Sequence, residues 1–235
     1  VKPVPGAYRS WGLRVDGVAA NSKGEGLVSI GLSEEIAGLW EWNGRGLARA
    51  GAGKQRTQTM DVSPTGEAIV LYRSGTVRYR GQGGWEIVNG LPPPLWNALS
   101  VKFRENGDLW IGTETGLFLQ QRASLMWSRS QHQFPDRRNS INAIVESRDG
   151  LVWLGNGEGV YAVGKDGAVA DKPRPGQGPV GAVTGLMEAD DGSMWVTIGV
   201  SFQGAWRWNG TGWRRFGSAD GLADLYFHGI WKDNK

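Results

Sequence analysis

A glycine that ends a polar turn returns at nearly constant intervals along this chain. Its occurrences, each followed by a short apolar segment, are Gly24, Gly66, Gly107, Gly150 and Gly192. Successive members of the series lie 42, 41, 43 and 42 residues apart. A period of about 20–50 residues is typical of repeat architectures, in which each unit buries its apolar face against its neighbours. The spacing therefore predicts about five copies of one supersecondary unit.

Each unit contains short segments with the periodicity of β-strands. An alternating segment such as "INAIVES" (141–147) precedes the glycine, and a second segment such as "DLWIGT" (108–113) follows it. The Asn-Gly or Asp-Gly between them tolerates the positive φ of a tight hairpin. A third segment such as "GLFLQQ" (116–121) and a fourth such as "GWRRFG" (212–217) complete the unit. Because helical periodicity is absent, the pattern predicts an all-β fold.

Four short antiparallel strands every 42 residues or so are typical of β-propeller blades. Trp110, Trp153 and Trp195 occupy one equivalent position in the second segment, and we expect these rings to fill the space between adjacent sheets. At least five blades are visible. The predicted units are 12–53, 54–95, 96–138, 139–180 and 181–223, with 224–235 the first strand of a further blade and 4–11 the last strand of a shared blade. A piece of a larger propeller and a closed five-bladed ring with surplus tails both fit this arrangement.

The phrase "NGDLWIGTETGLF" (106–118), preceded by "NALSVKFRE" (97–105), resembles the repeat of two-component regulator propellers. The third and fourth units match that repeat best. Leu27 and Ile69 stand where the repeat has Trp, and Thr197 stands where it has the glycine of "WIGT". The resemblance implies a periplasmic or extracellular sensor module, joined to further domains in a histidine kinase, hybrid regulator or cyclase. It implies a module that senses a ligand or docks a protein, with a small molecule, a glycan or a protein as the partner. Because the sequence carries no recognised enzyme motif, we expect a non-catalytic protein.

Two other function classes remain open. The segments "GAWRWNGTGWRRF" (204–216) and "GGWEIV" (83–88) are similar to tectonin-type lectin repeats, which favours carbohydrate binding as the alternative. A propeller glycosidase or lyase is the third hypothesis. It depends on Glu114 and Glu158, which fall in equivalent turns one unit apart, because glycoside hydrolysis needs two carboxyl groups across the sugar.

The composition argues against several other classes. The chain has no cysteine and only two histidines, which have no close partner in sequence, so we expect no cofactor and no metal site. Its net charge of +3 comes from scattered basic residues with acids between them, a pattern that does not favour nucleic acid. No apolar stretch approaches the roughly 20 residues needed to cross a bilayer, so we expect no membrane insertion of this segment. The sequence does not begin with Met, so we expect that a signal or upstream domain was removed.

Ligand binding is expected at the face of the propeller formed by the turns between second and third strands and by the connections between blades. A rigid ring of sheets positions such loops for binding. The predicted site residues are Arg73, Trp96, Asn97, Glu114, Arg137, Arg138, Asn139, Asn156, Glu158 and Asp220. Arg137 and Arg138 lie in the distinctive segment "FPDRRNS" (134–140), where paired guanidinium groups would suit a carboxylate or sulfate.

Overall fold

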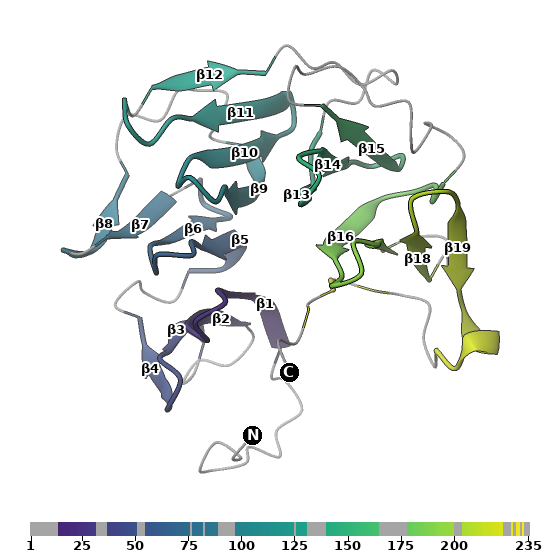
Figure 1. The fold of residues 1–235 in the computed structure, drawn as a ribbon. Helices are drawn as coiled ribbons and strands as arrows, with labels where there is room; N and C mark the ends of the chain where they lie inside the picture. The colour runs from purple at the N-terminus through teal and green to yellow at the C-terminus, as the bar shows by residue number, and fades with distance from the viewer. Residues whose placement is uncertain are drawn as a thin grey trace. The chain divides into compact units, whose positions relative to one another are not determined.

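The structure is a computed structural model, and nearly all of its regular secondary structure is β-strand. It describes residues 14–31, 37–50, 55–75, 77–81, 83–88, 97–124, 126–130, 140–164, 178–199, 204–222, 227, 229–230 and 232. The strands form five antiparallel sheets in which each strand pairs with the next one along the chain (Figure 1). The chain divides into two compact units, residues 1–88 and 89–235.

Unit one contains two four-stranded sheets. Their strands are β1 (Arg14–Ala20), β2 (Gly26–Gly31), β3 (Gly38–Trp42), β4 (Leu47–Arg49), β5 (Thr57–Val62), β6 (Ala68–Tyr72), β7 (Val77–Gly81) and β8 (Gly84–Ile87). We call β1–β4 blade one and β5–β8 blade two. The first strands of the two blades, β1 and β5, lie against each other.

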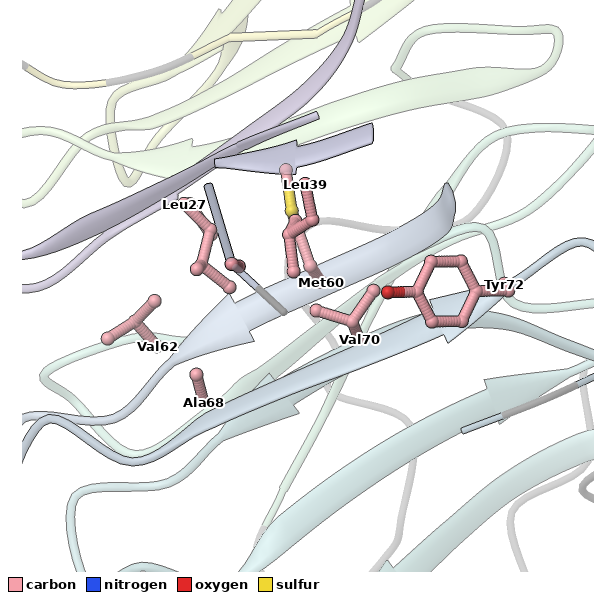
Figure 2. Packing of buried hydrophobic residues seen from close by; sticks show 9 residues of the cluster. Leu27, Leu39, Met60, Val62, Ala68, Val70 and Tyr72 are labelled. Carbon is pink, nitrogen blue, oxygen red and sulfur yellow. The ribbon is translucent and has the colours of Figure 1, made fainter. Parts of the chain in front are cut away.

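Blades one and two pack through apolar side chains (Figure 2). Leu27 and Leu39 of blade one are completely buried in one cluster with Met60, Val70 and Tyr72 of blade two. Full burial of a Leu side chain contributes about 1.5–3 kcal/mol relative to leaving it exposed. Neither sheet could bury this face alone, so the interface between blades is the core of the unit.

Unit two contains three sheets. The strands are β9 (Ala98–Phe103), β10 (Leu109–Thr113), β11 (Gly116–Gln120), β12 (Trp127–Arg129), β13 (Ala143–Glu146), β14 (Val152–Gly155), β15 (Val160–Val163), β16 (Val183–Glu188), β17 (Met194–Ile198), β18 (Ala205–Trp208) and β19 (Trp213–Phe216). We call β9–β12 blade three, β13–β15 blade four and β16–β19 blade five, which is followed by the short 3-10 helix η2 (Ser218–Asp220). The first strands again lie together, β9 against β13 and β13 against β16.

Two of the three equivalent tryptophans pack between blades as the sequence predicts. Trp110 of blade three packs against the cluster that contains Ile144 and Leu154 of blade four. Trp153 of blade four is 3% exposed and lies in one cluster with residues of blade five. Trp195 of blade five instead has its ring 4.8 Å from that of Phe216 in the same sheet. The face of blade five that carries Trp195 therefore differs from the corresponding faces of blades three and four.

The hairpin between the first and second strands explains the periodic glycine. The φ angles are 80° at Gly24, 91° at Gly66, 86° at Gly107, 84° at Gly150 and 78° at Gly192. This left-handed region disfavours residues with a Cβ, so glycine is the residue that closes each hairpin without strain. The turn is also hydrogen-bonded, as where Gly150 N donates to Ser147 O at 2.8 Å.

A second glycine, near the end of the second strand, is needed where one blade meets the next. A Cβ at Gly112 would lie 2.6 Å from Ile141 O of blade four, and one at Gly155 would lie 2.4 Å from a methyl carbon of Val183 in blade five. Gly112 pairs with Ser100 on the first strand. In blade five the two roles are exchanged, because Thr197 of the second strand pairs with Gly185 of the first. The departure of Thr197 from the repeat is therefore matched by a glycine opposite it.

Candidate functional site

Three parts of each four-stranded blade meet at one end of its sheet. Since neighbouring strands are antiparallel, the start of the first strand, the turn between the second and third strands, and the end of the fourth strand share an end. We call this the loop end of a blade. The structure describes six of the predicted site residues, and all six belong to segments of this kind: Arg73, Asn97, Glu114, Asn156, Glu158 and Asp220.

The loop end of blade three brings two predicted site residues together. Asn97 precedes β9 and Glu114 is in the β10–β11 turn, and Asn97 Nδ2 donates to Glu114 Oε2 at 3.3 Å. Both side chains are exposed. Buried Thr113 fixes the turn beneath them, because its hydroxyl donates to Gly116 O at 3.0 Å and accepts from Thr115 N at 3.1 Å. A rigid turn thus presents an exposed carboxylate beside an amide, a pair that can both accept and donate hydrogen bonds.

Asn156, at the loop end of blade four, is completely buried. Its Oδ1 accepts from Glu158 N at 2.8 Å and from Gly159 N at 2.9 Å, which closes the β14–β15 turn. Its backbone oxygen accepts from Val183 N of blade five at 2.9 Å. The side-chain oxygen of Asn156 therefore holds the turn in shape, and half-buried Glu158 follows from it.

The remaining predicted residues are spread over other segments. Arg73 is exposed in the β6–β7 turn of unit one, and its backbone N donates to Arg56 O. Asp220 lies in η2, where its carboxylate accepts from Gly217 N at 3.0 Å and from Arg214 at 2.8 Å. These two interactions, the Gly217 N–H first, lower the pKa of Asp220. Trp96, Arg137, Arg138 and Asn139 lie outside the described residues.

At the opposite end of the sheets, polar side chains of one blade contact those of the next, which the sequence analysis did not predict. Arg104, after β9, forms a bidentate ion pair with Glu146 of blade four, with N–O distances of 2.8 and 2.7 Å. The hydrogen bond to Glu146 raises the pKa of Arg104. Arg148 pairs with Glu188 of blade five at 3.5 Å. These ion pairs join one blade to the next. The sequence signal that could have predicted them is an Arg near one hairpin followed by a Glu about 42 residues later.

Blade five has a cation–aromatic cluster on the sheet face that carries Trp195. Arg207 lies over the Trp195 ring at 5.8 Å, and it also pairs with Asp191. Asp191 accepts in addition from the Ser193 hydroxyl at 2.6 Å, and this bond is the main cause of its lowered pKa. Arg214 lies over Phe216 at 4.3 Å. Each guanidinium group thus makes a cation–π contact with a ring on this face of the sheet.

The described part of the chain has neither a metal-binding cluster nor a membrane-spanning helix. No group of three or more His, Cys, Asp or Glu side chains there is arranged to hold a metal ion. None of the described segments forms a helix long and apolar enough to cross a membrane.

Comparison with known proteins identifies related folds. No protein-family model matches the sequence, and no curated protein matches it. The extracellular domain assigned to a hybrid two-component system of B. thetaiotaomicron, BT3049, matches with a TM-score of 0.71 and 16% identity over 96% of this chain and 31% of that one. A second such domain, assigned to the one-component system BT4673, matches with a TM-score of 0.61 and 11% identity, over 96% and 36%. Virginiamycin B lyase of Staphylococcus aureus matches with a TM-score of 0.65 and 12% identity, over 89% and 71%.

These likenesses establish the fold. The chain is a β-propeller built from antiparallel blades, as its repeat predicts. The sequence resemblance to two-component regulator propellers agrees with the structural neighbours, which include extracellular domains assigned to hybrid two-component systems. Lyases share the fold as well, so the fold by itself does not select a function.

Proposed function

We propose that this chain is a non-catalytic, ligand-sensing or protein-interaction propeller of a bacterial signalling protein, placed outside the cytoplasm. The observation that carries the proposal is the match of 96% of the chain to the extracellular domain of BT3049, with the highest of the TM-scores quoted above. The repeat "NGDLWIGT" (106–113) supports it independently from sequence. The chain spans 31% of that domain, so the sensing function proposed here is that of a module within a larger protein.

The proposed ligand-binding site lies at the loop ends of the blades. Glu114 and Asn97 offer an exposed carboxylate and amide on a turn whose backbone is fixed by Thr113. A ligand with hydroxyl or ammonium groups would find acceptors there without having to reorganise the turn, which lowers the cost of binding. A neutral or positively charged polar ligand therefore suits this position better than an anion.

The experiment is a binding screen with matched variants. The purified chain is tested by thermal shift and calorimetry against amino acids, oligosaccharides and peptides, and each hit is repeated with Glu114→Gln and Asn97→Ala. We expect a weakening of binding by about tenfold, the loss of one charge-assisted hydrogen bond. Asn106→Ala is the control, because Asn106 is exposed at the opposite end of the same blade and bonds Asp108 at 2.9 Å. Equal effects of Glu114→Gln and Asn106→Ala would reject the loop end of blade three as the binding position.

Carbohydrate binding is the second candidate, and a specific observation favours it. Trp42 is 39% exposed on β3, and Arg49 lies over neighbouring Trp40 at 5.0 Å, so blade one presents an aromatic and cationic surface. Aromatic rings of this kind can stack on the apolar faces of sugars. A glycan array with the wild-type chain and Trp42→Ala separates the hypotheses. Broad glycan binding that disappears in Trp42→Ala, while Glu114→Gln retains it, would favour the lectin function.

The lyase fold among the structural neighbours calls for a direct activity test. The chain is incubated with virginiamycin B, and opening or modification of the compound is followed by mass spectrometry. For a sensing module we expect the compound to remain intact. Turnover that is lost in Glu114→Gln or Glu158→Gln would instead support the catalytic hypothesis based on these two carboxylates.

A further inference from the structure

Residues beyond the last strand of blade five contact it in the way that one blade contacts the next. In blade three, the glycine position at Gly112 leaves room for Ile141, which precedes the first strand of blade four. In blade five, a Cβ at Gly185 would lie 3.0 Å from Ile230 N and 3.1 Å from Ile230 Cγ2. Ile230 therefore occupies, beside blade five, the kind of position that Ile141 occupies beside blade three.

Hydrogen bonds and ion pairs repeat the same relationship. The hydroxyl of Ser100 in β9 donates to Ile141 O at 2.7 Å, and the hydroxyl of Thr184 in β16 donates to Phe227 O, also at 2.7 Å. At the opposite end of the sheets, Asp190 pairs with Lys232, 42 residues further along. Arg104 and Glu146 have the same separation. The described residues between 227 and 232 form no strand, yet they have the contacts of a blade's first strand.

Ile230 lies on the face of blade five that carries Trp195. Gly185 pairs with Thr197, and Met187 pairs with Trp195 in the same register, so these four residues share one face of the sheet. Leu186, Met194, Val196 and Ile198 point to the other face, into the core shared with blade four. In blade four, the corresponding face carries Trp153, and blade five buries that ring. Phe227 and Ile230 thus lie where a sheet covering Trp195 would begin.

We propose that a further four-stranded blade of the same repeat, in the same polypeptide, covers the Trp195 face of blade five, with Phe227, Ile230 and Lys232 in its innermost strand. The established interfaces define the chemistry of this partner. Its inner face is apolar, like the row of Met194, Val196 and Ile198 that blade five presents to Trp153. The rings of Trp195 and Phe216 are its main contact, with Arg207 and Arg214 at the margin of the interface.

The test supplies such a blade and measures the protection of Trp195. The segment 192–217, which holds the hairpin glycine and strands β17–β19, is copied after Asp233 in place of Asn234 and Lys235. The copied glycine then follows Gly192 by 42 residues. Hydroxyl-radical oxidation with mass spectrometry compares Trp195 in the native and extended chains, with the four Trp residues of the copy replaced by Phe. We expect oxidation of Trp195 to fall by at least about tenfold, toward the rate of Trp153, because a docked sheet must open before the ring is exposed.

A control residue and a test of whether the added strands fold make the result interpretable. Trp42, which is 39% exposed in unit one, should be oxidised at the same rate in both chains. An extended chain whose added strands resist protease while Trp195 stays as reactive as before would overturn the proposal.

A second measurement on the native 235-residue chain covers the case in which the added strands do not fold. Gly185→Leu should raise the hydroxyl-radical oxidation of half-buried Phe227, because the new side chain takes the space of Ile230 and displaces its neighbours. Gly212→Leu is the matched control, since a Cβ there has no atom within 4 Å. A Phe227 side chain that is oxidised at the same rate in Gly185→Leu as in the native chain would also overturn the proposal.

Discussion

The substitution Gly112→Ala tests the way in which the blades fit together. The added Cβ would lie 2.3 Å from Ser100 Oγ and 2.6 Å from both Ile141 O and Ile141 Cγ2. One of these atoms belongs to the backbone, so it cannot rotate away. Overpacking of this kind costs about 1–3 kcal/mol, and the loss of the Ser100–Ile141 hydrogen bond would add about 1 kcal/mol. We expect a destabilisation of about 2–4 kcal/mol in total.

Urea unfolding followed by tryptophan fluorescence and circular dichroism measures this loss. Gly157→Ala is the control, because a Cβ at Gly157 meets no atom within 4 Å and its effect should stay within about 0.5 kcal/mol. The double variant Ser100→Gly/Gly112→Ala places the glycine on the first strand, as blade five does with Gly185. It should be more stable than the sum of the single changes by at least about 0.5 kcal/mol. A Gly112→Ala variant as stable as Gly157→Ala would refute the reasoning.

The remaining predictions concern polar groups. Arg104→Gln should destabilise the chain by about 1–2 kcal/mol, because it leaves the half-buried carboxylate of Glu146 without its bidentate partner; urea unfolding should show this loss shrinking in high salt. The pKa of Asp191, measured by NMR, should lie below its ordinary value and rise in Ser193→Ala. Since a lowered carboxylate pKa stabilises the fold above the unfolded-state pKa of about 3.9, this contribution should disappear as the pH falls through the native pKa of Asp191. Asn156→Ala should cost about 1–3 kcal/mol in urea unfolding, because it leaves two backbone N–H groups of the turn without their acceptor.

The fold could be predicted from the sequence because glycine is required at a fixed point of the hairpin between the first and second strands of every blade. The left-handed φ at Gly107 and Gly150 is a local property, so it leaves a periodic mark that needs no knowledge of tertiary contacts. The packing of Trp110 and Trp153 was predictable for a related reason, since both occupy one position of the repeat. Trp195 shares that position but contacts Phe216, because its surroundings depend on what covers the last sheet.

The candidate site was less predictable, because the role of a polar side chain depends on the distances its turn creates. Asn97 and Glu114 were expected on one face, and the structure places them within hydrogen-bonding distance. Asn156 stands in an equivalent turn, yet its side chain is buried and bonded to the backbone. Sequence position alone does not distinguish an exposed loop residue from one that holds the loop together. The assignment of these residues to ligand binding stays a prediction.

The exchange of glycine between strands has a consequence for how such a chain can vary. One blade leaves room for its neighbour in two alternative ways, either by pairing Ser100 with Gly112 or by pairing Gly185 with Thr197. Two residues with side chains at these paired positions would clash, and two glycines would leave a gap. Recombination between repeats is therefore expected to succeed when its crossover points fall in the connections between whole blades, which keeps each pair intact. A crossover inside the hairpin that joins the first two strands would separate the partners, so shuffled libraries made from this gene should be depleted of such chimeras among their folded members.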